Sequence, residues 1–309
     1  MLIEKNGKVV KGLGGLYNVR VEDGSGPSLY TCRAKGSLHR DEEKLLIGDN
    51  VTITIDDATP DGIIVSNISQ RKNALIRPPM ANLDFLFMVF AAKKPAPVLE
   101  VVDKLIAIAL HNGITPIVVI TKQDLSGSLA EEYERIYNKV GISTFVTSSE
   151  SREGVEALEK YIVDNIKNGK TAAFAGASGV GKSTLMNALF PSLELSTSEI
   201  SRKIERGRHT TRHVEIFDIG NGGFLADTPG FSLVDFARFD FFELEDLLHT
   251  FPDIERYASG CTYTDCSHVG EGGAVCAVAR AASEGLISES RLESYKSVYK
   301  ILKDKKNKF

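Results

Sequence analysis

The sequence lacks a long apolar run, and this excludes a membrane-spanning helix of ordinary length. The longest strongly apolar run, LDFLFMVFAA at 83–92, is shorter than the roughly 20 residues that a helix needs to span a bilayer. The first residues, MLIEKNGKVV, contain no apolar stretch like that of a secretory signal. With 42% hydrophobic and 25% charged residues, the 309-residue chain has the balance of a soluble globular protein. We therefore expect a cytoplasmic protein without a membrane partner.

The sequence also lacks an excess of positive charge. Its formal net charge of −4 provides no overall attraction to nucleic acid, so an RNA partner would have to be held by local basic segments. Two such segments are present, SRKIERGRHTTRH at 201–213 and YKILKDKKNKF at 299–309. For the second segment, composition alone favours a solvated helix face or a frayed tail over an RNA contact.

Cysteine is scarce, and its distribution favours a metal site over disulfides. Three of the four cysteines lie between 261 and 276, which in a cytosolic chain indicates metal binding. The spacing Cys261-x4-Cys266-x-His268-x7-Cys276 offers three thiolates and one imidazole, which is enough for a closed, tetrahedral, structural zinc site. The alternative is a set of buried thiols beside a surface histidine. Cys32 stands alone, and we expect it in the core of the first domain.

Three different sequence patterns follow one another along the chain, and they predict three domains. Residues 1–70 are glycine-rich with short alternating runs, which predicts a small all-β barrel, although the pattern alone does not single out the oligonucleotide-binding (OB) barrel. RPPM at 77–80 is a break, after which apolar strand-like runs alternate with helical patterns. This alternation predicts an α/β domain over 71–235, with a mostly parallel sheet covered on both faces. The pattern at 236–309 is helical, interrupted by the cysteine cluster.

The stretch GASGVGKST at 176–184 is the strongest motif. It satisfies G-x-x-x-x-G-K-[ST], follows an apolar strand-like run and precedes a helical pattern, which is the context of a phosphate-binding loop. Backbone N–H groups at the helix start would bind phosphate, Lys182 would supply a positive charge, and the Ser183 hydroxyl would bind magnesium. The predicted nucleotide-binding loop comprises Gly176, Ala177, Ser178, Gly179, Val180, Gly181, Lys182, Ser183 and Thr184.

The stretch ITKQD at 120–124 resembles the guanine-reading motif of GTPases. An aspartate there accepts hydrogen bonds from both guanine N1–H and N2–H, a pairing that adenine cannot offer, so Asp124 would select guanine. Lys122 would lay its apolar stem along the base. Thr121 replaces the usual asparagine and keeps a hydroxyl that could brace the phosphate loop. VTSSES at 146–151 resembles the loop that backs the base, through Ser148 and Ser149.

LADTPG at 225–230 resembles the magnesium and γ-phosphate motif Asp-x-x-Gly. Asp227 would hold magnesium through water, and the Gly230 N–H would meet the γ-phosphate. GRHTTRH at 207–213 stands where a first switch loop must be, and Thr210 or Thr211 would complete the magnesium shell. The base motifs precede the phosphate and magnesium motifs, the reverse of a conventional GTPase. A circular permutation explains this order, since it changes the connections and keeps the pocket.

Hydrolysis requires a group that orients water, and the usual glutamine after the Asp-x-x-Gly glycine is missing. Phe231 occupies that position and cannot hydrogen-bond. His209, in the predicted first switch, is the best catalytic candidate beside Lys182. The alternative is that His209 contacts RNA together with its arginine neighbours Arg206, Arg208 and Arg212, and from the residues alone both interpretations stand.

The motif order, the DTPG box followed by a hydrophobic residue and the downstream Cys/His cluster resemble the circularly permuted ribosome small-subunit-dependent GTPase A family. The resemblance covers essentially the whole chain. It implies an N-terminal OB-fold barrel, a permuted GTPase domain and a C-terminal helical zinc domain. It also implies GTP or GDP, magnesium and one structural zinc as cofactors, and it favours the catalytic role of His209. Members of the family accept threonine where Thr121 stands.

The resemblance further implies a partner, the small ribosomal subunit and its rRNA. The expected activity is GTP hydrolysis late in the maturation of that subunit, by a protein that we expect to be a monomer. Two other functions remain open at this point. One is a GTPase that acts on another RNA. The other is a nucleotide-gated RNA-binding scaffold with negligible hydrolysis, which Phe231 makes plausible.

Overall fold

The computed structural model describes residues 2–24, 26–36, 44–56, 62–191, 214–228 and 235–308. Its contacts divide the chain into two compact units. The first unit comprises Met1–Phe85, Glu159–Ala175 and Met186–Phe231, and the second comprises Leu86–Leu158, Gly176–Leu185 and Ser232–Phe309. Within the described ranges, no helix combines the length and the apolar character that crossing a membrane requires.

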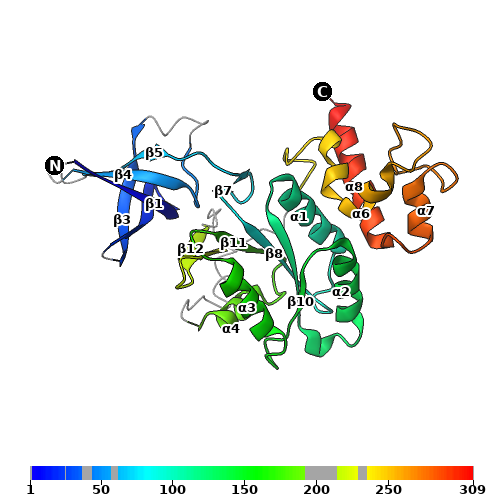
Figure 1. Ribbon diagram of the computed structural model, residues 1–309, viewed down its shortest axis with the longest axis horizontal. Helices are drawn as coiled ribbons and strands as arrows, with labels where there is room; N and C mark the ends of the chain where they lie inside the picture. The colour runs from blue at the N-terminus through cyan, green and yellow to red at the C-terminus, as the bar shows by residue number, and fades with distance from the viewer. Residues whose placement is uncertain are drawn as a thin grey trace, which may run out of the picture. The chain divides into compact units, whose positions relative to one another are not determined.

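Five strands form a closed barrel at the start of the first unit (Figure 1). They are β1 (Leu2–Leu13), β2 (Leu16–Asp23), β3 (Gly26–Ala34), β4 (Asn50–Asp56) and β5 (Ile63–Ile68). Their order is β1-β2-β3-β5-β4, and β4 pairs with β1 to close the barrel. This is the strand order of the OB fold, so the barrel expected from the alternating runs is confirmed. The alternation places Val9, Val19 and Ile53 in the core, together with Cys32, which is 1% exposed.

A short two-stranded element connects the barrel to the rest of the first unit. It pairs β6 (Ala74–Leu75) with β7 (Met80–Ala81), and the two prolines of RPPM lie in the turn between them. The barrel loop before β4 packs tightly here, because a Cβ added at Gly48 would lie 2.1 Å from the Ala81 carbonyl oxygen. Gly48 also has a φ of +92°, a conformation that favours glycine. Nearby, Arg71 Nε donates to Asp49 Oδ1 at 2.7 Å.

The α/β region contains a sheet of six strands in the order β10-β9-β8-β11-β13-β12. The strands are β8 (Phe85–Ala91), β9 (Thr115–Thr121), β10 (Thr144–Val146), β11 (Thr171–Ala175), β12 (Glu215–Asp218) and β13 (Phe224–Asp227). β10 runs parallel to β9 and β11 runs parallel to β13, whereas β12 and β13 form an antiparallel hairpin. Every residue of β8 and of β11 is buried, as in a sheet whose two faces are covered. The expected mostly parallel sheet is thus confirmed.

The helices of this region lie between the strands in the chain (Figure 1). They are α1 (Leu99–His111), α2 (Leu129–Val140), α3 (Val155–Asn165) and α4 (Lys182–Leu189). A helix between two strands lets the second strand run parallel to the first, as β10 does to β9 after α2. The carboxyl ends of β9 and β10 therefore lie together, as do those of β11 and β13.

The C-terminal region is helical, as the sequence predicts. It contains the short turns η5 (Leu244–Asp246) and η6 (Leu248–Thr250) and the helices α6 (Pro252–Ala258), α7 (Ala277–Ser283) and α8 (Glu289–Lys306). Figure 1 shows α6, α7 and α8 grouped together, with the irregular segment 259–276 between α6 and α7. This irregular segment carries the predicted zinc ligands.

A fully buried arginine anchors these C-terminal helices on α1. Arg291 of α8 donates through Nη1 to Asp103 Oδ1 of α1 at 2.9 Å and through Nη2 to Asp253 Oδ1 of α6 at 2.7 Å. Its guanidinium also lies 4.7 Å from the ring centre of Phe251. Removing one partner from a buried ion pair is costly, because the other charge is then left without compensation in a medium that solvates it poorly.

We expect Arg291→Met to lower the free energy of unfolding of the second unit by about 3–5 kcal/mol, because Asp103 and Asp253 would lose their shared cation. Lys296→Met on the same helix is a matched control. Lys296 forms an ion pair with Glu293, whose side chain is exposed, so this change should cost less than about 1 kcal/mol. Urea unfolding of both variants measures the difference, and equal midpoints would contradict the anchoring role.

Candidate nucleotide and metal sites

The predicted phosphate loop connects the end of β11 to the start of α4. Gly176 is required by packing, because a Cβ there would lie 2.1 Å from the Val89 carbonyl oxygen. Lys182 folds back over the loop, and its Nζ donates to the Gly176 oxygen at 2.7 Å and to the Ala177 oxygen at 3.2 Å. The ammonium group thus lies at the loop itself, where a bound phosphate needs a positive charge. Of the other predicted loop residues, Val180 is buried, Ser183 is partly buried, and Ser178, Gly179 and Thr184 are exposed.

The end of β9 contacts the phosphate loop through two side chains. Thr121 is 2% exposed, and its hydroxyl oxygen lies 2.5 Å from the Val180 carbonyl oxygen and 3.2 Å from that of Phe90. A hydroxyl has one proton to donate, and the shorter distance assigns it to Val180. The threonine therefore braces the phosphate loop from β9, in the position where GTPases usually have an asparagine.

Lys122 forms the second contact between β9 and the phosphate loop. Its φ is +59°, which is uncommon for a residue other than glycine. Its Nζ donates to the carbonyl oxygens of Gly179 and Lys94, both at 2.7 Å. Because both ends of the side chain are fixed, its apolar stem has a defined course between the base motif and the phosphate loop.

Asp124 follows in the single turn η3 (Gln123–Leu125). Ser148, at the end of the neighbouring strand β10, donates to Asp124 Oδ1 at 2.6 Å and accepts from the Ser151 N–H at 3.2 Å. Ser148 is fully buried, whereas Ser149 is partly buried. Of these two serines, Ser148 thus orients the carboxylate that is expected to read the base. The geometry links the two base motifs directly, although 24 residues separate them.

The magnesium side of the site is described in part. Asp227 is the last residue of β13, and its backbone pairs with Phe174 of β11 in the parallel ladder. Thr228, which sequence reasoning did not single out, is fully buried, and its hydroxyl donates to the Phe174 carbonyl oxygen at 2.7 Å. The Asp-x-x-Gly motif is therefore fixed to β11 by a side chain inside the motif. The remaining predicted residues of this side lie outside the described residues: His209, Thr210, Thr211, Gly230 and Phe231.

The four predicted zinc ligands lie together in the segment between α6 and α7. Their ligand atoms are all within 4.8 Å of one another. His268 Nδ1 lies 3.5 Å from Cys261 Sγ and 3.6 Å from Cys276 Sγ, and these two sulfurs are 3.9 Å apart. A tetrahedral zinc site has N–S and S–S separations of about 3.6 and 3.8 Å. With Cys266 as the fourth ligand, the donor set and its spacing fit a closed zinc site.

The surroundings of two thiols shift their pKa values in opposite directions. Burial opposes ionisation of Cys261, but the N–H groups of Ala277 and Val278 and the neighbouring thiols stabilise its thiolate and lower its pKa. Burial and the other two sulfurs raise the pKa of Cys266 to about 12. A first thiolate in the cluster thus opposes the next one unless a positive charge enters the cluster.

Glu271 organises the metal loop and is a second residue that sequence reasoning missed. Its carboxylate accepts hydrogen bonds from the N–H groups of Ser267, Val269 and Gly270 and from the Ser267 hydroxyl. Burial opposes its ionisation, but these donors prevail and lower its pKa to about 2. The turn that they hold carries His268, whose φ of +60° is strained for a residue with a Cβ. A single glutamate among glycines gave no signal of this role in the sequence.

Comparison with known proteins agrees with this geometry. The profile described as RsgA GTPase matches residues 68–237, and that described as RsgA N-terminal domain matches residues 6–64. This chain belongs to the RsgA GTPase family. The match to the RsgA GTPase profile contains the base motifs, the phosphate loop and DTPG in that order. The permuted motif order therefore lies within a single family domain.

Relatives and solved structures of the RsgA family extend over the full chain. The Listeria monocytogenes protein named Small ribosomal subunit biogenesis GTPase RsgA 2 is 40% identical, over 98% of this chain and 99% of that protein. The Bacillus velezensis RsgA is 38% identical over the same shares. The crystal structure of YjeQ from Thermotoga maritima is 31% identical with a TM-score of 0.78, over 97% of this chain and 99% of that one. YloQ, described as a circularly permuted GTPase, is 32% identical with a TM-score of 0.75, over 98% and 96%.

We expect Asp124→Asn to weaken GTP binding and to shift preference toward xanthine nucleotides, because an amide donor suits the exocyclic oxygen of xanthine better than a carboxylate does. Titration with fluorescent guanine and xanthine nucleotides measures both effects. Gln123→Ala, next to Asp124 in the same turn, serves as the control and should keep the preference for guanine. Unchanged GTP affinity in Asp124→Asn would show that 120–124 does not read the base.

We expect Cys261→Ser to release zinc and to destabilise the C-terminal region while leaving GDP affinity nearly intact, because a closed structural site contributes to folding. Elemental analysis of protein purified without chelators gives the zinc content, and thermal unfolding gives the stability. Cys32→Ala removes a thiol from the barrel core and should leave the zinc content unchanged. Absence of zinc from the unaltered protein would exclude the site.

Proposed function

We propose that this chain is a GTPase that acts in the biogenesis of the small ribosomal subunit and hydrolyses GTP to GDP and phosphate when stimulated by that subunit. The contact of Thr121 with the phosphate loop, next to an oriented Asp124, is the observation that carries the guanine-nucleotide assignment. The relatives' names carry the choice of partner, since they are small-subunit biogenesis GTPases. The proposal also includes that the protein is a monomer, that it is cytoplasmic and that it binds rRNA.

The residues of the site have distinct roles in this proposal. Asp124 reads guanine, the phosphate loop holds the phosphates through its N–H groups, and Lys182 offsets their charge. Ser183 and Asp227 would hold magnesium, which neutralises charge on the phosphates, while Gly230 meets the γ-phosphate. These positions follow the Walker-type loop and the Asp-x-x-Gly motif, residue by residue.

In this proposal, a residue of the first switch activates the water that attacks the γ-phosphate. Phe231 cannot hydrogen-bond, so His209 would orient or deprotonate the attacking water. Thr210 or Thr211 would complete the magnesium shell when the loop closes. Ordering of the loop by contact between its arginines and rRNA would explain dependence on the subunit.

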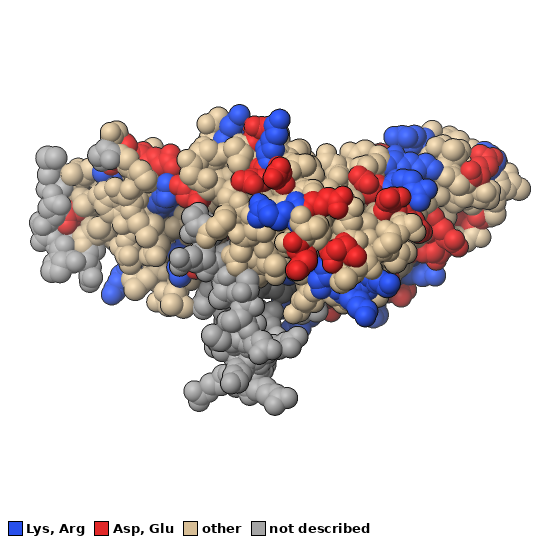
Figure 2. Space-filling model, turned by 90° about the horizontal axis from the view of Figure 1, so that it is seen from below, with Lys and Arg blue, Asp and Glu red and all other residues tan. Residues whose placement is uncertain are grey.

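The charge distribution favours the first switch over the C-terminal tail as the main RNA contact. Lys305 pairs with Asp240 and Lys306 pairs with Glu245, so part of the basic run at 299–309 is already neutralised within the protein. Figure 2 shows acidic and basic side chains interspersed over the face in view, without a single basic field. We therefore assign rRNA contact first to Arg206, Arg208 and Arg212, whose charges lie close together in the sequence.

Co-sedimentation and phosphate release together test the proposed function. The protein should sediment with small ribosomal subunits in a non-hydrolysable GTP analogue and leave them in GDP, and the subunits should accelerate multiple-turnover phosphate release. Binding without accelerated release would favour the nucleotide-gated scaffold. Failure to bind subunits, with hydrolysis stimulated by a different RNA, would favour a GTPase of that RNA.

We expect His209→Ala to retain GTP and subunit binding but to lose about 10²–10⁴-fold of the subunit-stimulated rate, because general base catalysis or water positioning contributes on this order. The matched variant replaces Arg206, Arg208 and Arg212 together. It should weaken subunit binding in a salt-dependent way and leave slow intrinsic hydrolysis unchanged. A normal rate for His209→Ala on saturating subunits would make His209 an RNA contact instead.

A further inference from the structure

Three cations on one side of the β1–β2 hairpin face the strands that border the magnesium motif. Lys8 and Arg20 are directly opposite each other in the β1–β2 ladder, and Lys11 follows on β1. Lys8 is 7% exposed, and its Nζ donates to the Thr171 hydroxyl at 3.2 Å and lies 5.4 Å from the ring centre of Phe224. All of these residues belong to the first compact unit.

The acidic partners of the other two cations are the first and last residues of β12. Lys11 Nζ lies 3.0 Å from each carboxylate oxygen of Glu215. Arg20 pairs with Asp218, and both side chains are largely shielded, at 22% and 18% exposure. The two ion pairs therefore hold this four-residue strand at both ends.

The register of the β12–β13 hairpin connects these pairs to the magnesium motif. Glu215 is directly opposite Asp227, and Asp218 is directly opposite Phe224. Asp227 begins the DTPG motif, while β12 follows the predicted first switch in the chain. A displacement of β12 would thus act on the start of the DTPG motif, because the ladder hydrogen bonds make the hairpin move as one element.

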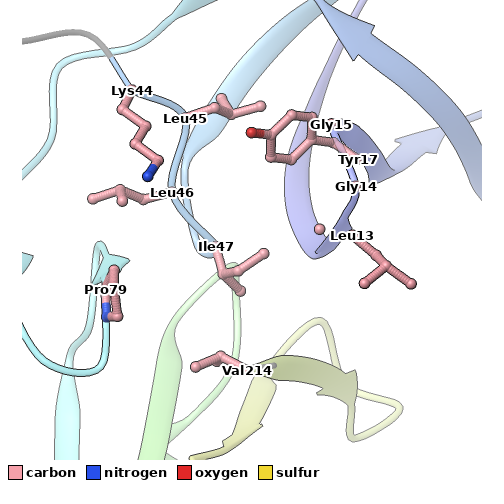
Figure 3. Close-up of a pocket in the computed structure, with 11 residues that line it drawn as sticks. Leu13, Gly14, Gly15, Tyr17, Lys44, Leu45, Leu46, Ile47, Pro79 and Val214 are labelled. Carbon is pink, nitrogen blue, oxygen red and sulfur yellow. The ribbon is translucent and has the colours of Figure 1, made fainter. Parts of the chain in front are cut away.

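A pocket lies between the barrel and the residue that precedes β12. The described residues leave a cavity of about 260 Å³, whose lining includes Leu13, Tyr17, Leu46, Ile47, Pro79 and Val214 (Figure 3). Val214 immediately precedes Glu215. Side chains that line a pocket forgo some dispersion contacts, and the two ion pairs on the next residues hold β12 beside it.

We propose that the Lys11–Glu215 and Arg20–Asp218 pairs form a clamp through which the barrel positions the β12–β13 hairpin, and with it Asp227, for magnesium binding. Lys11 and Arg20 are positioning residues in this scheme and have no contact with nucleotide. The inference rests on the proposed function, because it takes Asp227 as the residue that holds magnesium. It adds a route by which whatever binds the barrel acts on the GTPase site, and by linkage the reverse.

The strength of the clamp suits a regulatory contact. The Lys11 and Glu215 side chains are 42% and 40% exposed, and such a pair biases an equilibrium by about two- to fivefold. The more shielded Arg20–Asp218 pair adds to this bias. Contacts of this size shift the hairpin between positions without locking it.

Charge reversal tests the clamp with a readout that needs neither subunits nor hydrolysis. If Ser183 and Asp227 hold magnesium against the phosphates, magnesium slows dissociation of a fluorescent GTP analogue, and the magnesium concentration for half-maximal slowing is measured. Lys11→Glu and Glu215→Lys should each raise this concentration about three- to tenfold, and the double variant should return it to within about twofold of the unaltered protein. Nucleotide affinity in EDTA should stay unchanged in all three, because the base and phosphate loop contacts are not altered.

Lys5→Glu is the matched control, because Lys5 lies on the same strand and pairs with Asp23, which is also a residue of the barrel domain. It should not change the magnesium dependence. The clamp is excluded if both single reversals behave like Lys5→Glu, or if the double variant stays as impaired as the single ones. If the unaltered protein shows no stimulation by subunits while the variants show the expected magnesium shifts, the result counts against the proposed function and not against the clamp. The two failures are therefore distinguishable.

Discussion

The carboxyl ends of parallel strands lie at one edge of their sheet, and the nucleotide site depends on this constraint. β9 and β10 run parallel and adjacent, so the loops that follow them meet, and the Ser148 hydroxyl reaches Asp124. β11 and β13 run parallel in the same way, which brings Thr228 to the Phe174 carbonyl. The order of these strands in the chain is immaterial to the contacts, which is why a permuted sequence retains the pocket.

Much of this arrangement is predictable from the sequence, because the informative residues either favour turns and breaks, as glycine and proline do, or are rare, as cysteine is. Glycines with a lysine and a serine after an apolar run define the phosphate loop, and three cysteines with one histidine define the zinc site. Alternation predicts the barrel, and the apolar run at 83–92 contains the fully buried strand β8. In each case the pattern reflects a backbone or ligand requirement that few other residues satisfy.

The contacts that the sequence does not reveal join ordinary residues over long separations. Arg291 and Asp103 are 188 residues apart, and each lies in a helical pattern where a charge normally indicates a solvated face. Glu271 acts through backbone N–H groups, which leave no trace in residue identity. The Lys122 contact depends on the Lys94 carbonyl, whose position only the folded loop determines. Periodicity reports which face is buried, but not which charges become paired there.

The distance in sequence between Lys11 and Glu215 has a consequence for how the protein is made. These residues are 204 positions apart, so a chain leaving the ribosome exposes the complete barrel long before β12 exists. The base-reading strands β9 and β10 are likewise synthesised before the phosphate loop and before DTPG. Because domains tend to fold as they emerge, the barrel and the base-reading half can fold while the nascent chain still lacks phosphate affinity. The permutation thus places synthesis of the base-reading half before synthesis of the phosphate loop and of DTPG.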